Sequence, residues 1–92
     1  MDVVSRKDIE AAASRINGRV RRTPVIQLEE AAFGIDAEIF LKLELFQHTG
    51  SFKPRGAFNR ILSADVPRAG VITASGGNHG QAVAYAAKVL GI

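Results

Sequence analysis

A lysine, Lys53, lies in the most distinctive segment of this 92-residue sequence, where residues 49–57 read Thr-Gly-Ser-Phe-Lys-Pro-Arg-Gly-Ala. Ser51 can cap a helix that begins near Phe52, with Pro54 tolerated in its first turn. The amides and the dipole at a helix start disfavour a cation. An amine in that position suits Schiff-base chemistry, which needs a neutral lysine. A lone lysine in a polar segment is more often a solvated charge, so this interpretation depends on its surroundings.

A glycine-rich turn follows further along the chain, where residues 75–81 read Ser-Gly-Gly-Asn-His-Gly-Gln. It separates a short apolar strand predicted at 71–74 from an alanine-rich helix predicted at 81–90. Ligands of open α/β sheets bind at the carboxyl ends of strands, and free amides at a helix start favour an anion. The turn lacks the Lys-Ser/Thr pair of a Walker loop and the three spaced glycines of a dinucleotide fingerprint. By itself it is equally well explained as a turn without a ligand.

The remaining elements are predicted from caps, periodicity and breakers. We expect a helix after a capping box at 5–8 that stops at 17–18, extended segments at 23–28 and 37–44, and a helical turn at 28–33. The helix near Phe52 carries apolar residues toward a core, namely Phe58, Ile61 and Leu62. The order of strands, turns and helices predicts the α/β class, with an open parallel sheet and flanking helices. Since such a sheet is normally covered on both faces, the sheet is expected to be incomplete and residues 1–92 to be a single partial domain.

Composition restricts the class of protein further. The sequence is 47% hydrophobic and 23% charged, as in soluble globular proteins, and no apolar run is long enough to predict a membrane partner. The absence of cysteine excludes disulfides and Cys-based zinc sites and favours a cytoplasmic location. No metal-binding residue is expected in this sequence. Basic residues are dense before position 23, but acidic residues are interspersed and stacking aromatics are missing. A solvated helix face is therefore favoured over a nucleic-acid partner.

Taken together, the two motifs resemble those of fold-type II pyridoxal-phosphate (PLP) enzymes, whose fold is tryptophan synthase beta-like. Within them the chain looks most like the branch of threonine/serine dehydratases (ammonia-lyases) and serine racemases. The resemblance runs through nearly the whole chain and includes Arg-Thr-Pro at 22–24, Lys-Leu-Glu at 42–44, and Gln47. It implies that the chain is the amino-terminal segment of a catalytic region, with PLP as cofactor, and that the complete protein is a homodimer.

The resemblance also implies residue roles. Lys53 would form an imine with the cofactor aldehyde and, once displaced, would take the Cα proton of an amino-acid substrate. Asn78 would hydrogen-bond the ring hydroxyl oxygen and Phe52 would pack beside the ring. The substrate carboxylate would be received by the loop of Ser75, Gly76, Gly77, Asn78 and His79. For His79, direct substrate contact and simply holding the turn together remain equally open.

The implied reaction is β-elimination of L-threonine or L-serine to a 2-oxo acid and ammonia. Gly76 stands where serine racemases carry a second serine, so elimination is favoured over racemisation. The glycine-rich loop that binds the cofactor phosphate in the family is outside these residues, so the 92-residue chain alone is expected to be inactive. Two alternatives stay open: a PLP- or amino-acid-binding module without turnover, and a poorly folding truncation product. His48 is interpreted as plain surface and Arg55 as a structural ion-pair former.

Overall fold

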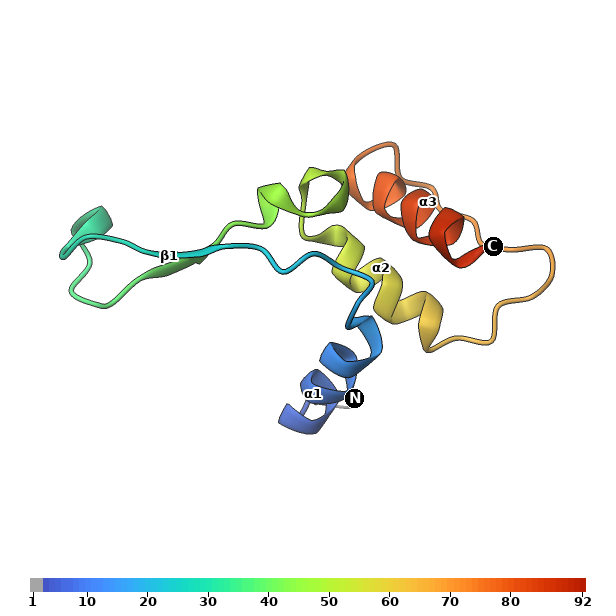
Figure 1. Ribbon diagram of the computed structural model, residues 1–92, viewed down its shortest axis with the longest axis horizontal. Coiled ribbons are helices and arrows are strands. Elements are labelled where there is room, and N and C mark those ends of the chain that lie inside the picture. Colours follow the sequence, from blue (N-terminus) through green and yellow to red (C-terminus); the bar gives the residue numbers. More distant parts are fainter. Residues whose placement is uncertain (1–2) are drawn as a thin grey trace.

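Among the residues that the structure describes, three α-helices lie together at one end and a long two-stranded ribbon projects from them (Figure 1). This computed structural model describes residues 3–92. The helices are α1 (Arg6–Ile16), α2 (Lys53–Leu62) and α3 (Asn78–Leu90). The strands are β1 (Val25–Gln27) and β2 (Phe40–Lys42), and 3-10 turns occur at η1 (Ala32–Gly34), η2 (Glu44–Phe46) and η3 (His48–Gly50).

The ends of the helices follow the signals in the sequence. Ser5 Oγ accepts a hydrogen bond from the amide of Asp8, and the Asp8 carboxylate accepts one from the amide of Ser5, so the predicted capping box is confirmed. The helix α1 ends at Ile16, with Asn17 as its C-cap and Gly18 at φ +80°. The helix α3 ends as predicted at Gly91, which adopts the left-handed conformation that glycine tolerates best. It begins at Asn78, three residues earlier than the sequence predicted.

The sheet differs from the prediction. Within residues 3–92 it is an antiparallel pair with the register Val25↔Lys42, Ile26↔Leu41 and Gln27↔Phe40. The predicted strand at 71–74 is wrong for the described residues: the segment forms no β-ladder there. A strand exists only by pairing with a neighbour, and the pattern of apolar residues does not say whether a neighbour is present. The parallel pairing that was predicted is therefore not formed among these residues.

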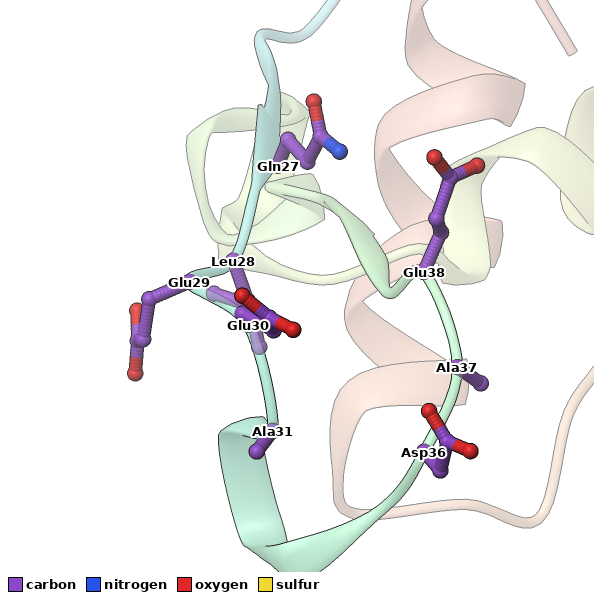
Figure 2. A pocket seen from close by; sticks show the side chains of 8 residues that line it. All are labelled: Gln27, Leu28, Glu29, Glu30, Ala31, Asp36, Ala37 and Glu38. Carbon is purple, nitrogen blue, oxygen red and sulfur yellow. The ribbon is translucent and has the colours of Figure 1, made fainter.

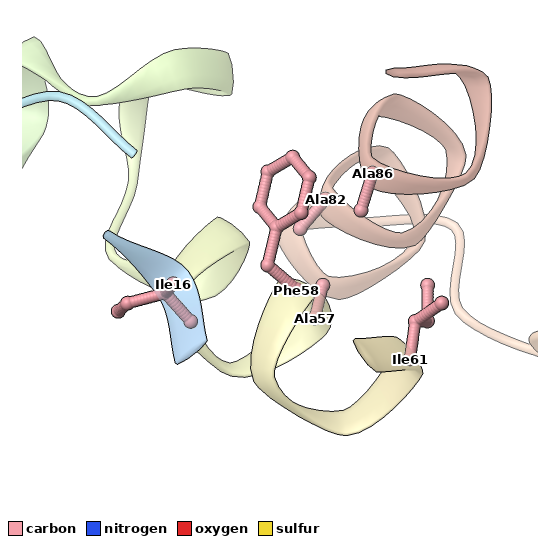
Figure 3. Close-up of a cluster of buried hydrophobic side chains, with 6 residues drawn as sticks. All are labelled: Ile16, Ala57, Phe58, Ile61, Ala82 and Ala86. Carbon is pink, nitrogen blue, oxygen red and sulfur yellow. The ribbon is translucent and has the colours of Figure 1, made fainter. Parts of the chain in front are cut away.

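The core lies mainly between α2 and α3. Phe58 of α2 is completely buried, and Figure 3 shows its ring pointing at Ala82 and Ala86 of α3. The small alanine side chains let the two helices approach closely, since interaxial distance depends on the residues at the contact. Ile16 of α1 joins the same cluster. Tyr85 packs edge-on against Phe58, with 6.1 Å between ring centroids.

This core is small for the length of the chain. The radius of gyration is 15.9 Å, whereas a compact domain of this length has one of about 12 Å. Large apolar residues remain exposed along the ribbon, the loops and the chain ends, with Ile72 98% exposed. Within the described residues, no helix has both the length and the apolar character needed to cross a membrane.

Candidate functional site

Lys53 is the first residue of α2. Phe52 is in the N-cap position, where its side chain makes no capping hydrogen bond, and the Ser51 hydroxyl instead accepts from the amide of Lys53 at 3.3 Å. The ammonium nitrogen of Lys53 lies 5.1 Å from the centroid of the Phe52 ring, within cation–π distance. The first turn of α2 thus presents a lysine and an exposed aromatic ring side by side.

A hollow of about 440 Å³ opens beside this pair, which is within the range of small-molecule sites. Its lining comes from the start of α2 and from one residue of α3: Phe52, Lys53, Arg55, Gly56, Ala57 and His79. A second hollow of about 210 Å³ shares Gly56, Ala57 and His79 and continues toward the 71–73 segment. Of the predicted substrate loop, His79 is therefore the residue that the fold brings to the same hollow as Lys53.

The rest of that loop is an exposed turn next to the hollow. The Ser75 hydroxyl accepts from the amide of Gly77 at 3.1 Å, so the hydroxyl hydrogen of Ser75 stays available to a ligand. Asn78 begins α3, whose first amides have no partner within the helix and favour an anion. Ser75, Gly76, Gly77 and Asn78 are exposed and do not line the hollow with Lys53.

A network of buried polar side chains contacts the first turn of α2. Gln47 is 2% exposed and hydrogen-bonds the backbone of Arg21 and the carboxylate of Glu44. Glu44 in turn pairs with Arg55 at 3.2 Å, which agrees with the prediction that Arg55 forms an ion pair. The sequence motif had marked Gln47 only as a match to the family. Its buried contacts join residues that are 26 positions apart, and no local pattern reveals them.

His48 is not the plain surface residue that was predicted. It is half-buried, and its ring stacks on Tyr85 of α3 with 4.7 Å between centroids and an interplanar angle of 26°. Burial, and then the charge of Arg21, lower the pKa of His48 below its usual value of 6.5. The long-range contact with Tyr85 decides its environment, and a loop position in sequence carries no signal of it.

A separate hollow of about 350 Å³ lies at the tip of the ribbon, between the ends of β1 and β2. Figure 2 shows four acidic side chains around it, with the carboxylates of Glu29 and Glu38 pointing in different directions. Within the residues that the structure describes, no three His, Cys, Asp or Glu side chains gather as they would around a metal ion. The chemistry-bearing residues are at the start of α2 instead, and the candidate site is there.

A family model described as pyridoxal-phosphate dependent enzyme matches residues 16–92. The chain therefore belongs to the family of PLP-dependent enzymes. Among curated relatives, the catabolic L-threonine dehydratase of Staphylococcus aureus (strain USA300) is 48% identical over 93 residues, which cover 98% of this chain and 27% of that protein.

Solved structures agree with this assignment. A threonine deaminase from T.th. has a TM-score of 0.79 and 42% identity, and the match covers 97% of this chain and 31% of the deaminase chain. Maize serine racemase has a TM-score of 0.83 and 41% identity, covering 99% and 29%. These likenesses confirm the family, the fold class and PLP as the cofactor of the family. The chain spans about a quarter of the length of the curated relatives it matches.

Proposed function

We propose that residues 1–92 form the lysine-bearing, amino-terminal part of the catalytic region of a PLP-dependent dehydratase. The observation that carries the proposal is that Lys53, Phe52 and His79 line one hollow at the starts of α2 and α3. The cofactor is an aromatic aldehyde that also carries a hydroxyl and a phosphate. The Lys53 amine matches the aldehyde, and the Phe52 ring, which is 59% exposed, matches the cofactor ring. Gly76 and Gly77, each with open space where a Cβ would stand, leave room for a substrate.

In this proposal Lys53 would hold the cofactor aldehyde, Phe52 would pack beside the ring, and Asn78 would donate to the ring hydroxyl oxygen. When bound, PLP supplies the electron sink for a carbanion at Cα, which the protein does not supply. Once the amino group of the substrate had displaced it, the free Lys53 amine would take the Cα proton of the substrate. The Ser75 hydroxyl and the free amides at the start of α3 hold the substrate carboxylate.

The proposed reaction is loss of the β-hydroxyl from L-threonine or L-serine, giving a 2-oxo acid and ammonia. The likeness to maize serine racemase makes racemisation the second candidate. Gly76 argues against racemisation because glycine has no side chain to move a proton on the face opposite Lys53. A Cβ built at Gly76 meets no atom within 4 Å, so the space for a serine is present although the serine is not.

Cofactor binding is tested on the 92-residue chain by incubation with PLP, reduction with borohydride and peptide mapping. The sequence has four lysines, Lys7, Lys42, Lys53 and Lys88. Lys53 is expected to carry most of the label, and Lys53→Ala to lose that fraction while the other lysines keep theirs. Labelling spread over the four lysines according to exposure alone would contradict the assignment.

Turnover is tested in a chimera, because the chain alone is proposed to lack catalytic activity. Residues 1–92 replace the matching segment of the Staphylococcus aureus dehydratase, and products are measured from L-threonine and L-serine. We expect the chimera to release 2-oxo acid and ammonia, and to form D-serine much more slowly than it releases pyruvate. Lys53→Ala should lose both the 2-oxo acid and the ammonia. D-serine formation at a rate rivalling pyruvate release would favour the racemase candidate. The same chimera shows whether the proposed homodimer forms.

A further inference from the structure

Gln47 makes as many hydrogen bonds as its side chain allows. Its Oε1 accepts from the amides of Arg21 at 2.8 Å and His48 at 3.1 Å, and its Nε2 donates to the Arg21 carbonyl at 2.9 Å and to Glu44 Oε2 at 3.0 Å. An amide side chain has two acceptor and two donor positions, and all four are used. The side chain is buried, so each bond is one that water cannot replace.

These bonds connect the loop before Lys53 to two other parts of the molecule. The Arg21 backbone belongs to the segment that enters β1, and the Arg21 guanidinium also donates to the carbonyl of Phe46 at 3.2 Å. On the other side, Glu44 accepts from the Gln47 amide with Oε2, while its buried Oε1 lies 3.2 Å from the Arg55 guanidinium as an ion pair without hydrogen-bond geometry. Arg55 lies two residues after Lys53 in the first turn of α2.

The next residue in the loop reaches α3. His48 stacks on Tyr85, which itself packs against the buried Phe58 of α2. Residues 47 and 48 therefore fix the η2–η3 loop against the segment entering β1, the helix that bears Lys53 and the helix that begins with Asn78.

The backbone that follows requires such fixing. Thr49 has φ +65°, a left-handed conformation that a β-branched residue rarely adopts, and Gly50 follows at φ +80°. A strained residue keeps such a conformation only where its surroundings determine it. Nothing but Ser51 and Phe52 then separates this bend from Lys53, so the direction in which α2 begins depends on the contacts made at 47 and 48.

We propose that Gln47 is a positioning residue for Lys53: through Glu44 and Arg55 on one side and the Arg21 backbone on the other, its amide sets where the lysine lies relative to Phe52 and His79. This inference rests on the proposed function of Lys53. It differs from a purely structural role, which would change the stability of the chain and leave the reactivity of Lys53 in the folded chain unaltered.

The test uses Gln47→Glu, which keeps the size of the side chain and turns its two donor hydrogens into an acceptor. That acceptor faces the Arg21 carbonyl and the Glu44 carboxylate. Gln27→Glu is the matched control because Gln27 is exposed in β1 and does not line the hollow beside Lys53. Each variant is incubated with PLP and reduced below its melting temperature, and the ratio of label at Lys53 to label at Lys88 is determined by peptide mapping across pH.

We expect the ratio in Gln47→Glu to fall about tenfold or more and the ratio in Gln27→Glu to match the unmodified chain. The double variant Glu44→Gln/Gln47→Glu restores a donor between the two side chains and should recover part of the ratio. If the unmodified chain is labelled preferentially at Lys53 and folded Gln47→Glu shows the same ratio, the positioning role of Gln47 is overturned while the proposed function stands. No preference for Lys53 in the unmodified chain overturns the proposed function, and the inference with it.

Should Gln47→Glu fail to fold, Glu44→Gln carries the test, because it removes the charge that faces Arg55 and preserves the volume of the side chain. A lowered Lys53 to Lys88 ratio in folded Glu44→Gln supports the network. A ratio equal to that of the unmodified chain contradicts it.

Discussion

Gly80 shows how a single residue sets the shape of the turn before α3. A Cβ at this position would collide with the carbonyl oxygen of Ser75, which is backbone and cannot move aside as a flexible side chain would. Gly56 is also inside a helix, but a Cβ added there would have no atom within 4 Å. The two glycines therefore have opposite meanings, although both are in helices.

Alanine substitutions at these two positions should change stability in opposite directions. Gly80→Ala is expected to lower the free energy of unfolding by about 1–3 kcal/mol, because the Ser75 carbonyl must be displaced. Gly56→Ala is expected to raise it by about 0.5–1 kcal/mol, since alanine favours the helix and meets no obstacle. Urea unfolding followed by circular dichroism measures both. Equal effects of the two substitutions would refute the close approach at Gly80.

At the residue scale, the sequence motifs led to the proposed chemistry, but they did not reveal the contacts that position these residues. Lys53 and His79 were proposed from their motifs, and the fold brings both to one hollow. The Gln47 amide, the stacking of His48 and the crowding at Gly80 all depend on partners supplied by the folded chain. The local sequence around each of these residues is compatible with a plain surface position, so the spacing of residue types along the chain cannot predict these contacts.

Between elements, the stack of His48 on Tyr85 attaches η3 to α3 and predicts a dependence on pH. Because the pKa of His48 is lowered in the folded chain, the unfolded chain binds the proton more tightly. This contribution to stability is complete above about pH 6.5, the ordinary value for histidine, and is lost as the pH falls toward the folded pKa. His48→Phe keeps a stacked ring without the proton.

We expect His48→Phe to flatten the loss of stability between neutral and mildly acidic pH relative to the unmodified chain. Urea midpoints at a series of pH values from 7.5 downward would be compared for the two proteins, since their other titrating groups are the same. Parallel curves would show that His48 titrates as it does in the unfolded chain.

The contact of α2 with α3 is expected to hold most of the stability of the molecule. Phe58 fills it, whereas five of the eight buried hydrophobic residues found within residues 3–92 are alanines, which bury little surface each. Phe58→Ala should cost about 3–5 kcal/mol and unfold much of the helix pair at 25 °C. Phe46→Ala, at a 52% exposed aromatic, is the control and should change stability by no more than about 0.5 kcal/mol. Far-ultraviolet circular dichroism distinguishes the two results.

The elements themselves were predictable to different degrees. Helix ends follow local signals, so the capping box at 5–8 and the stop at Gly91 were predicted correctly. Strands follow from pairing, which is not local. The segments around β1 and β2 were predicted to be extended and are, but their antiparallel pairing and the unpaired state of 71–74 within residues 3–92 depend on which neighbours are present.

At the scale of the whole molecule, the described chain is elongated and leaves much of its apolar surface exposed. A two-stranded ribbon is marginal by itself, yet here it extends the molecule to 52 Å with Val25, Ile26, Phe40 and Leu41 exposed. The site end has the same character, with Phe52 and Ile72 exposed near the hollow. The relatives contain further segments outside the part that matches this chain. We expect the exposed apolar surface to be covered when residues 1–92 are combined with such segments.

The chain alone should therefore bind a hydrophobic dye such as ANS and show a radius of gyration near 16 Å rather than 12 Å in X-ray scattering. Adding the part of the Staphylococcus aureus dehydratase that lies outside the matched segment should lower the dye fluorescence and give a complex by size exclusion, because apolar surface is then buried. The matched segment of the relative, added in place of the remainder, is the control and should do neither. A chain that is compact and does not bind the dye would contradict the exposed surface. A chain that binds the dye equally with and without the remainder would contradict the proposal that residues 1–92 are the leading part of a larger catalytic region.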